Sequence, residues 1–448
     1  MLPRIVPPER PLGRLAFVTT FVRNPLAVVP RAAYEEDFVP GPAARRGSAW
    51  VTGPALVRQV LLDERDKFQK LSQIRLLSPL LGKGILTSEG ADWRWQRQAS
   101  SPMFRREDLL GFVPTFVRST QKLLEAWRAD GGREAGVRPI DRDMSHVTFD
   151  VISATLLPSA DAEVGSTVQR SLETFQKTAG WDILFALARV PQWMPRPGFI
   201  AGGRAVVALR RAVGKMVDER RLLAHVPDDL MSRLMRARDP ETGQAMNDEQ
   251  LIDNLLTFYL AGHETTARAL TWTLYLLARF PEWMEKLSEE VFSITRGAPV
   301  AAEHIDKLVL VQQVLKEAMR LYPPVPLMSR QAVAETTLAG HTLPLGTSVV
   351  MPIYVIHRHR KRWERPDDFE PERFAPEREA AIERYQYMPF GAGPRICIGR
   401  AFAEIEATAM LATMLQHARF APAGHHPQPV ARVTLLPQGG MPLRVTLH

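Results

Sequence analysis

The chain has 448 residues, a net charge of +8 and a single cysteine. Lys and Arg number 57 against 49 Asp and Glu, a modest excess, whereas a nucleic-acid binder concentrates its positive charge in one stripe. One cysteine excludes an internal disulfide and agrees with a reducing compartment. No signal peptide is evident, and the apolar stretch at residues 15–29 is shorter than the roughly 20 residues that span a bilayer. We therefore expect a soluble, cytoplasmic protein with no nucleic-acid partner and no membrane span.

Helical periodicity dominates the middle of the chain. The clearest helix is predicted over residues 248–279, with Asn247 as its N-cap and Pro281 just after its end. It is far longer than the average helix of about 11–12 residues, so we expect it to be buried in the middle of the molecule. A second helix is predicted over residues 308–321, where two consecutive prolines follow one residue later.

After these helices the pattern changes to short strands rich in Val, Thr and Ile, at residues 328–333 and 347–353. The densest basic run, residues 357–362, follows; we interpret it as a solvated surface loop, the alternative being a docking patch for an acidic protein. Residues 363–394 form a long irregular stretch, which inside a compact domain is usually functional.

A last helix, residues 399–416, and a hairpin of residues 432–436 and 443–447 close the chain. No repeat and no flexible linker divides the sequence. We therefore expect one domain over residues 1–448, mainly helical with a smaller β-rich part.

The only cysteine, Cys397, lies just before the last predicted helix, in the segment Phe390-Gly391-Ala392-Gly393-Pro394-Arg395-Ile396-Cys397-Ile398-Gly399. Backbone N–H groups and the positive end of the helix dipole stabilise a thiolate at such a position. The glycines let the backbone approach a flat ligand closely, and Arg395 supplies a cation for an anionic group. A buried, inert cysteine is the alternative, and the surrounding pattern argues against it.

This segment resembles the haem-binding loop of the cytochrome P-450 superfamily, Phe-x-x-Gly-x-Arg-x-Cys-x-Gly. All five fixed positions match: Phe390, Gly393, Arg395, Cys397 and Gly399. The resemblance implies a single-domain cytochrome P-450 fold with haem b, whose iron takes the Cys397 thiolate as axial ligand. It also implies that Phe390 packs beside the sulfur and the porphyrin, and that Gly391 and Gly399 belong to the cofactor-binding residues.

A second motif, Ala261-Gly262-His263-Glu264-Thr265-Thr266, lies in the middle of the long helix, where Gly and two Thr are poor helix formers. A local rule broken inside a buried element suggests function, although a glycine tolerated at a tight helix crossing is the alternative. The motif resembles the oxygen-binding groove of the superfamily. This implies that Thr265 and Glu264 are catalytic residues that deliver protons, and that Ala261 contacts the cofactor. His263 falls at a variable position, and we interpret it as a structural or solvent-side residue.

Glu317 and Arg320 lie one helical turn apart, and Arg373 follows before the cysteine loop. Their order resembles the Glu–Arg–Arg triad of the superfamily, which implies a buried network that serves folding and haem retention.

Four further residues match propionate-binding positions of the superfamily: Trp93 and Arg97, which share a helix face, together with Arg330 and Arg395. After His357-Arg358 the superfamily often has Asp-Pro, whereas this chain has His359-Arg360; we interpret the difference as a change in a surface loop.

The resemblance extends from about Trp93 to the terminal hairpin. It implies a monooxygenase that inserts one oxygen atom from O2 into a hydrophobic organic substrate. Electrons would come from NAD(P)H through a separate partner, an acidic ferredoxin or flavodoxin-type protein, because no fused reductase is expected in this chain; the enzyme would be a monomer. Two alternatives are a haem-thiolate peroxygenase that uses hydrogen peroxide, which the Glu264-Thr265 pair argues against, and a non-enzymatic haem-thiolate sensor, which would carry an extra regulatory domain.

The substrate pocket is expected to be apolar. Core packing is the alternative for each candidate lining residue: Leu76, Leu77, Leu80, Phe258, Ala261, Val325, Leu327 and Met441. Residues 181–194 are rich in aromatic side chains and are a candidate lid.

Overall fold

The structure, a computed structural model, describes residues 2–10, 12–41, 47–132, 136–156, 194, 199–223, 227, 229–239 and 242–448. The chain forms two compact units. Unit 1 comprises Met1–Gln69, Leu109–Thr148 and Glu264–His448, and unit 2 comprises Lys70–Asp108 and Phe149–His263. The candidate lid at residues 181–194 lies outside the described residues, apart from Met194.

Within the described residues, every strand lies in unit 1. The largest sheet has the order β1-β2-β8-β5-β3. Only β2 and β8 pair in parallel; the other neighbours are antiparallel. The bounds are β1 (Phe38–Pro40), β2 (Ser48–Val51), β3 (Phe68–Gln69), β5 (Met328–Ala332) and β8 (Ser348–Met351). The strands predicted at residues 328–333 and 347–353 are β5 and β8, and α14 (Ile353–Ile356) begins where the second was expected to end.

The smaller sheets of unit 1 correct the predicted terminal hairpin. A three-stranded sheet has the order β4-β12-β9, with β4 (Gly136–Pro139), β9 (Ala418–Pro422) and β12 (Pro442–Leu447). The two-stranded sheets are β10 (Gln428–Ala431) with β11 (Leu435–Gln438), and β6 (Thr336–Leu338) with β7 (His341–Leu343). The predicted pairing of residues 432–436 with 443–447 is therefore wrong. The alternation of apolar and polar residues at 443–447, which the burial of β12 follows, predicts a strand but carries no information about its partner strand.

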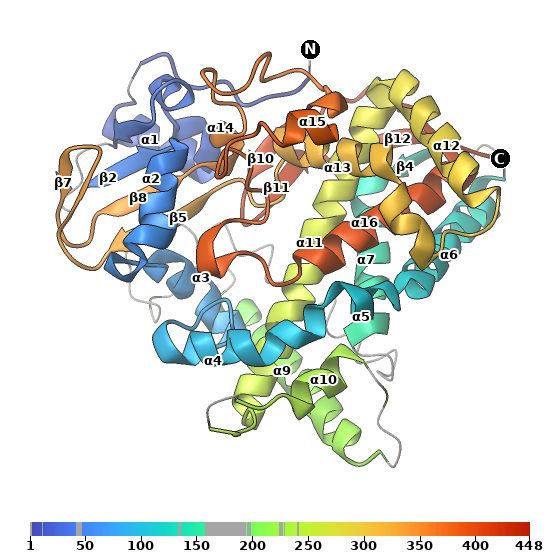
Figure 1. Ribbon diagram of the computed structural model, residues 1–448, viewed down its shortest axis with the longest axis horizontal. Helices are drawn as coiled ribbons and strands as arrows, with labels where there is room; N and C mark the ends of the chain where they lie inside the picture. The colour runs from blue at the N-terminus through green and yellow to red at the C-terminus, as the bar shows by residue number, and fades with distance from the viewer. Residues whose placement is uncertain are drawn as a thin grey trace. The chain divides into compact units, whose positions relative to one another are not determined.

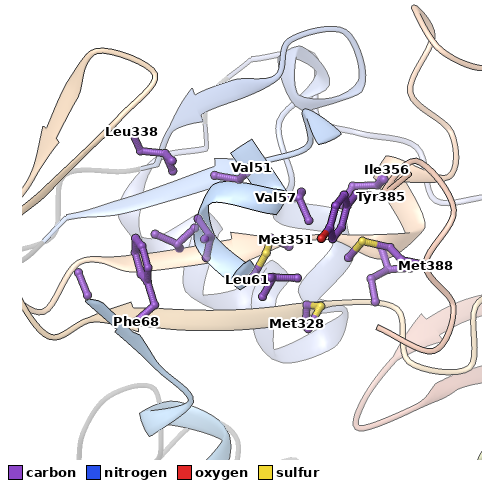
Figure 2. Packing of buried hydrophobic residues seen from close by; sticks show 14 of the residues in the cluster. Val51, Val57, Leu61, Phe68, Met328, Leu338, Met351, Ile356, Tyr385 and Met388 are labelled. Atoms are coloured by element: carbon purple, nitrogen blue, oxygen red, sulfur yellow. The ribbon is translucent and has the colours of Figure 1, made fainter. Parts of the chain in front are cut away.

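The five-stranded sheet packs on α2 (Pro54–Arg58) and on the segment that leads to the cysteine loop (Figure 2). Val51 of β2, Val57 of α2 and Met351 of β8 belong to the same buried cluster as Tyr385 and Met388. This apolar core therefore fixes the chain two residues before the loop begins.

In unit 1 the last helix, α16 (Arg400–His417), packs against α6 (Val113–Gly131), α12 (Pro281–Thr295) and α13 (Val309–Leu321) (Figure 1). The helices predicted over residues 308–321 and 399–416 are α13 and α16, each confirmed to within a residue. The remaining helices of unit 1 are α1 (Arg14–Arg23), α14 and α15 (Pro376–Glu379). The stretch at residues 363–394 is irregular apart from α15 and two short 3-10 turns, Pro371–Phe374 and Gly393–Arg395, the second of which extends one residue beyond it.

Unit 2 is helical in its described residues, with α3 (Leu71–Leu81), α4 (Gly90–Ser100), α9 (Phe199–Arg221) and α10 (Leu230–Arg236). Three helices have residues in both units: α5 (Arg106–Leu110), α7 (Ile140–Leu156) and α11 (Asp248–Arg279). No helix in the described part of the chain is long and apolar enough to cross a membrane. The expectation of a mainly helical fold with a smaller β-rich part is confirmed.

Helix α11 is the long helix predicted from the sequence, and its start is capped as expected. Asn247 Oδ1 accepts a hydrogen bond from the Gln250 N–H at 2.9 Å, and Gln250 Oε1 accepts one from the Asn247 N–H at 3.1 Å. This reciprocal pair is a capping box, which satisfies two backbone donors at the helix start.

The interpretation of the basic run at residues 357–362 as a solvated loop is wrong for its first half. His357, Arg358 and His359 are buried, whereas Arg360 and Lys361 are exposed. His357 Nε2 accepts a hydrogen bond from the Met388 N–H at 2.9 Å, and burial, with nearby arginines, lowers the pKa of its ring to about 3. His359-Arg360 stands where the superfamily often has Asp-Pro, and we interpreted this difference as a change in a surface loop. Because His359 is buried, that interpretation is also wrong for His359. All four residues of the preceding helix α14 are buried, so the residues that follow it directly, His357 to His359, also lie in the core. The number of charged residues in the run does not reveal this.

Candidate functional site

Cys397 lies at the end of a closed loop in unit 1 and is exposed. Its N–H donates to the Phe390 carbonyl at 2.9 Å, and the Ile396 N–H donates to the Gly393 carbonyl at 3.1 Å. Helix α16 begins three residues after the cysteine. As the only cysteine of the chain, Cys397 forms no disulfide, so an accessible sulfur stands beside a helix start, where a thiolate is favoured.

Two glycines of the loop are required by its backbone. Gly391 and Gly393 have φ of 71° and 70°, in the left-handed region that favours glycine. A Cβ at Gly393 would also lie 2.6 Å from the Leu61 carbonyl oxygen. Gly399, by contrast, has φ of −85°, which other residues adopt without strain.

Unit 1 also holds Phe390 and two of the predicted propionate-binding cations. Arg330 is buried on β5 and donates to the Ser329 carbonyl at 2.8 Å. Arg395 is half-buried in the 3-10 turn Gly393–Arg395, two residues before the cysteine. The ring of Phe390 is half-buried, with the Arg400 guanidinium 5.7 Å from its centroid.

Unit 2 holds the other three predicted cofactor contacts. Trp93 and Arg97 are half-buried on α4 and lie one turn apart, as their spacing predicts. Ala261 is exposed on α11, four residues before Thr265.

The Glu264 carboxylate is buried in unit 1 and has two side-chain partners at the same oxygen. Its Oε1 accepts a hydrogen bond from Thr434 Oγ1 at 2.8 Å and lies 3.5 Å from Nη2 of Arg268, one turn further along α11. Thr265 beside it is half-buried. The sequence interpretation missed both partners; only Arg268, at i+4, had a spacing that could have indicated the contact.

His263 is a core residue rather than a solvent-side one. Its side chain is buried, and its ring meets the edge of Phe149 at 5.7 Å, both within unit 2. The structural interpretation of His263 is therefore the one that the packing supports.

The sequence interpretation also missed one buried carboxyl. Glu406 on α16 is 1% exposed, and burial raises the pKa of its carboxyl to about 8. The Thr266 hydroxyl, also buried, is the group that opposes this rise. The available signal was an acidic residue inside the apolar pattern of the last helix.

The Glu–Arg–Arg residues come together in unit 1. Arg320 Nε and Nη2 donate to the two carboxylate oxygens of Glu317, both at 2.7 Å, and both side chains are fully buried. Arg373 Nε lies 3.5 Å from Glu317 Oε1. Arg320 also donates to three backbone carbonyls before the cysteine loop: that of His357 at 3.0 Å, and those of Pro366 at 2.7 Å and Asp368 at 2.8 Å in the irregular stretch.

The candidate pocket residues divide between the units. In unit 2, Leu77, Leu80 and Phe258 are buried and Leu76 is half-buried, and the Phe258 ring meets the edge of Phe104 at 5.4 Å. In unit 1, Val325 and Leu327 are half-buried, and Met441 is buried at 1% exposure, as a core residue is.

The residues of unit 1 suit a haem by their chemistry. Cys397 offers an exposed soft sulfur donor, and Gly393 leaves no side chain where the loop meets Leu61. Arg330 and Arg395 offer cations for the two propionates.

Comparisons with known proteins agree with this arrangement. Residues 43–443 match the family model described as cytochrome P-450. The chain is 30% identical over 425 residues to cyclooctat-9-en-7-ol 5-monooxygenase of Streptomyces melanosporofaciens, covering 93% of this chain and 91% of that protein. It is 33% identical over 380 residues to a cytokinin hydroxylase of Arabidopsis thaliana, covering 81% of this chain and 71% of that one. The solved haem domain of cytochrome P450DA superposes with a TM-score of 0.86 at 24% identity, covering 100% and 99% of the two chains, which shows the shared fold.

Proposed function

The chain belongs to the cytochrome P-450 family of haem-thiolate monooxygenases, and from this premise we propose that Cys397 is the thiolate ligand of its haem iron. One observation carries the proposal: the only thiol of the chain is exposed just before α16. It stands at the end of a loop that the hydrogen bond from the Cys397 N–H to the Phe390 carbonyl closes. Backbone N–H groups and the helix start lower the cost of the negative charge on that sulfur.

Nine residues of the chain are proposed to hold the haem, Cys397 among them. Arg330 and Arg395, with Trp93 and Arg97, would bind its propionates through charge-assisted hydrogen bonds. Phe390, Gly391, Gly399 and Ala261 would contact the porphyrin. When bound, the haem supplies the redox chemistry by which one atom of O2 enters the substrate and the other is reduced to water.

Thr265 and Glu264 are proposed to deliver protons for that chemistry. The Thr265 hydroxyl holds a proton and donates it for the reduction of O2, and the Glu264 carboxyl then supplies the hydroxyl with another proton. Thr434 and Arg268 both engage Oε1 of Glu264, so they fix the orientation of the carboxyl and balance its charge in a buried place.

The substrate is proposed to be an apolar organic small molecule, in line with the names of the relatives, a cyclooctat-9-en-7-ol monooxygenase and a cytokinin hydroxylase. It would lie against some of the candidate pocket residues Leu76, Leu77, Leu80, Phe258, Val325, Leu327 and Met441. The electrons would come from NAD(P)H through a separate ferredoxin or flavodoxin-type protein, with residues 1–448 acting as one haem-thiolate domain. The acidic character of the donor, the monomeric state and the cytoplasmic location stay predictions.

The test is a reconstitution with a ferredoxin, its reductase and NADPH, using substrates found by the shift in haem spin state that binding causes. With isotopically labelled O2, the proposal expects one labelled oxygen atom in the product. Product formed from hydrogen peroxide at the same rate, with no gain from the redox partners, would instead identify a peroxygenase. Carbon monoxide binding without oxidation of any compound that shifts the spin state would identify a sensor.

Thr265 is tested by substitution with Ala and with Ser. Thr265→Ala removes the hydroxyl, so we expect the enzyme to consume NADPH but to release more of the electrons as hydrogen peroxide. Thr265→Ser keeps the hydroxyl and is expected to restore most of the product formed per NADPH. Equal coupling in all three proteins would remove Thr265 from proton delivery.

A further inference from the structure

A hollow on the surface of unit 2 is bordered by four arginines: Arg105, Arg233, Arg236 and Arg238. Its volume is about 550 Å³, within the range of about 300–1,000 Å³ that small-molecule sites have. Its walls come from the end of α4 and the turn after it, from α5, and from the end of α10 with the residues that follow. None of the residues proposed above to hold the haem or to contact the substrate belongs to it.

The hollow carries an excess of positive charge. Among the described residues that line it, Asp108 on α5 is the one carboxylate, against the four arginines. Its Oδ2 lies 3.8 Å from Nη1 of Arg233, at the outer limit of an ion pair. Like charges gathered on one concave surface repel one another, and the low-dielectric walls concentrate their field inside it. The hollow therefore attracts anions.

The end of α10 explains two of these cations without a ligand. Arg233 and Arg236 lie in its last turn, where positive side chains complement the helix dipole. Arg105 and Arg238 lie outside that helix: the first follows the 3-10 turn Ser101–Phe104, and the second lies two residues after α10 ends. The dipole gives no reason for these two side chains to border the same hollow.

The guanidinium of Arg238 is held in place by the backbone. Its Nη1 donates to the carbonyls of Met235 at 3.1 Å and of Ala237 at 3.0 Å. The next residue closes a turn, in which the Asp239 N–H donates to the Gln244 carbonyl at 2.8 Å. These carbonyls are neutral, so they orient the guanidinium without balancing its charge. A side chain that is already ordered loses less conformational freedom when it binds an anion.

The lining residues also divide by polarity. Ala99 and Met103 are buried and apolar, whereas Arg105, Arg236 and Arg238 are exposed. The hollow therefore offers an apolar base and a cationic rim, which suits an anion that carries an apolar part as well as a bare anion.

We propose that this hollow binds a phosphate-bearing anion, with the guanidinium groups of Arg105, Arg236 and Arg238 on the phosphate oxygens. Guanidinium presents a planar set of donors that matches phosphate oxygens in pairs, and such charge-assisted hydrogen bonds are the strong ones. Free diphosphate and the diphosphate of a nucleotide share this chemistry. The proposal is independent of the haem ligand and of the proton-delivery residues.

The test is calorimetric titration of the haem-containing protein with inorganic pyrophosphate and with ADP, at constant ionic strength, with potassium chloride as the control. We expect one pyrophosphate per chain and no saturable binding of chloride. ADP that binds more tightly than pyrophosphate would identify a nucleotide as the ligand, with its nucleoside against Ala99 and Met103. Equal affinities would identify the diphosphate group alone.

Substitutions locate the site. Arg105→Gln and Arg238→Gln should each weaken pyrophosphate binding by about tenfold or more, because each removes hydrogen bonds to a charged group. The two residues belong to different walls, so either variant serves if the other does not fold. Asp108→Asn removes the repelling carboxylate and should tighten binding severalfold. The control, Arg211→Gln, removes an exposed arginine of α9 that does not line the hollow, and should bind pyrophosphate like the wild type.

Three results would overturn the proposal. The first is pyrophosphate binding no stronger than that of chloride. The second is a loss of affinity in Arg211→Gln equal to that in Arg105→Gln and Arg238→Gln, because the effect would then come from net charge alone. The third is an absence of pyrophosphate binding together with slower electron transfer from a ferredoxin in both lining variants, which would identify the hollow as part of a protein-docking surface.

Discussion

Arg320 is the residue whose loss is expected to damage the fold of unit 1 most. Its guanidinium makes two hydrogen bonds to the Glu317 carboxylate, and both of these side chains are fully buried. It also donates to the carbonyls of His357, Pro366 and Asp368, of which the hydrogen bond to His357 is buried and the other two are partly buried. Arg320→Leu leaves a buried carboxylate without its main partner and three carbonyls without a donor.

The magnitude follows from these contacts. Removing one partner of a buried ion pair costs about 3–5 kcal/mol, and the buried His357 carbonyl left without this donor adds about 1 kcal/mol or more, whereas water can reach the partly buried carbonyls of Pro366 and Asp368. Arg373, 3.5 Å from Glu317, offsets part of the lost charge interaction. We expect a loss on the order of 5 kcal/mol, comparable with the whole stability of a small domain. Arg320→Lys keeps the positive charge but not the planar guanidinium with its fixed set of donors. Its stability should therefore lie between that of the wild type and that of Arg320→Leu.

The assay is the urea midpoint of unfolding, together with the haem retained after gel filtration. The matched control is Lys316→Ala on the same helix, because Lys316 makes a partly exposed ion pair with Glu379 at 2.7 Å that is worth at most about 1 kcal/mol. If Arg320→Leu loses no more stability than Lys316→Ala, the reasoning about the buried network is refuted.

Two further substitutions test the path to the cysteine. Gly393→Ala should lower the haem content and the unfolding midpoint far more than Gly424→Ala. Both positions have positive φ, of 70° and 82°. Of the two, only Gly393 would bring its Cβ against a backbone atom, the Leu61 carbonyl oxygen at 2.6 Å. Equal effects would contradict this. His357 is neutral in the fold, with its pKa lowered from 6.5 to about 3, so the unfolded chain binds the extra proton and stability is lost as pH falls from about 6.5 toward 3. This difference of 3.5 corresponds to about 5 kcal/mol, and His357→Gln should flatten the acid side of the stability profile; an unchanged acid side would show that the imidazole is not the cause.

Most of the helices could be predicted from the sequence because their signals are local. Asn247 and Pro281 marked the ends of α11, and the apolar spacing of α16 was sufficient to place it. The pairing of β11 and β12 could not be predicted, because strand pairing joins residues far apart in the chain and alternation does not name the partner.

The candidate site was predicted best where residue order carries the information. The cysteine loop and the Glu317–Arg320–Arg373 network could be expected from motifs, and the structure brings the three triad residues together. Thr434 and Glu406 were missed because each meets the α11 motif from more than a hundred residues away. The prediction that His357 is exposed was wrong. Its charged neighbours indicated a position on the surface, whereas the buried helix α14 directly before it keeps it in the core.

The role of Cys397 is the centre of this account, and the spectrum of the reduced protein with carbon monoxide tests it most directly. A thiolate ligand shifts the Soret band of the ferrous–CO complex strongly to the red. The account predicts this band in the wild type and its complete absence in Cys397→Ala, with Thr265→Ala retaining it. A red-shifted band that survives in Cys397→Ala would contradict the assignment of the ligand.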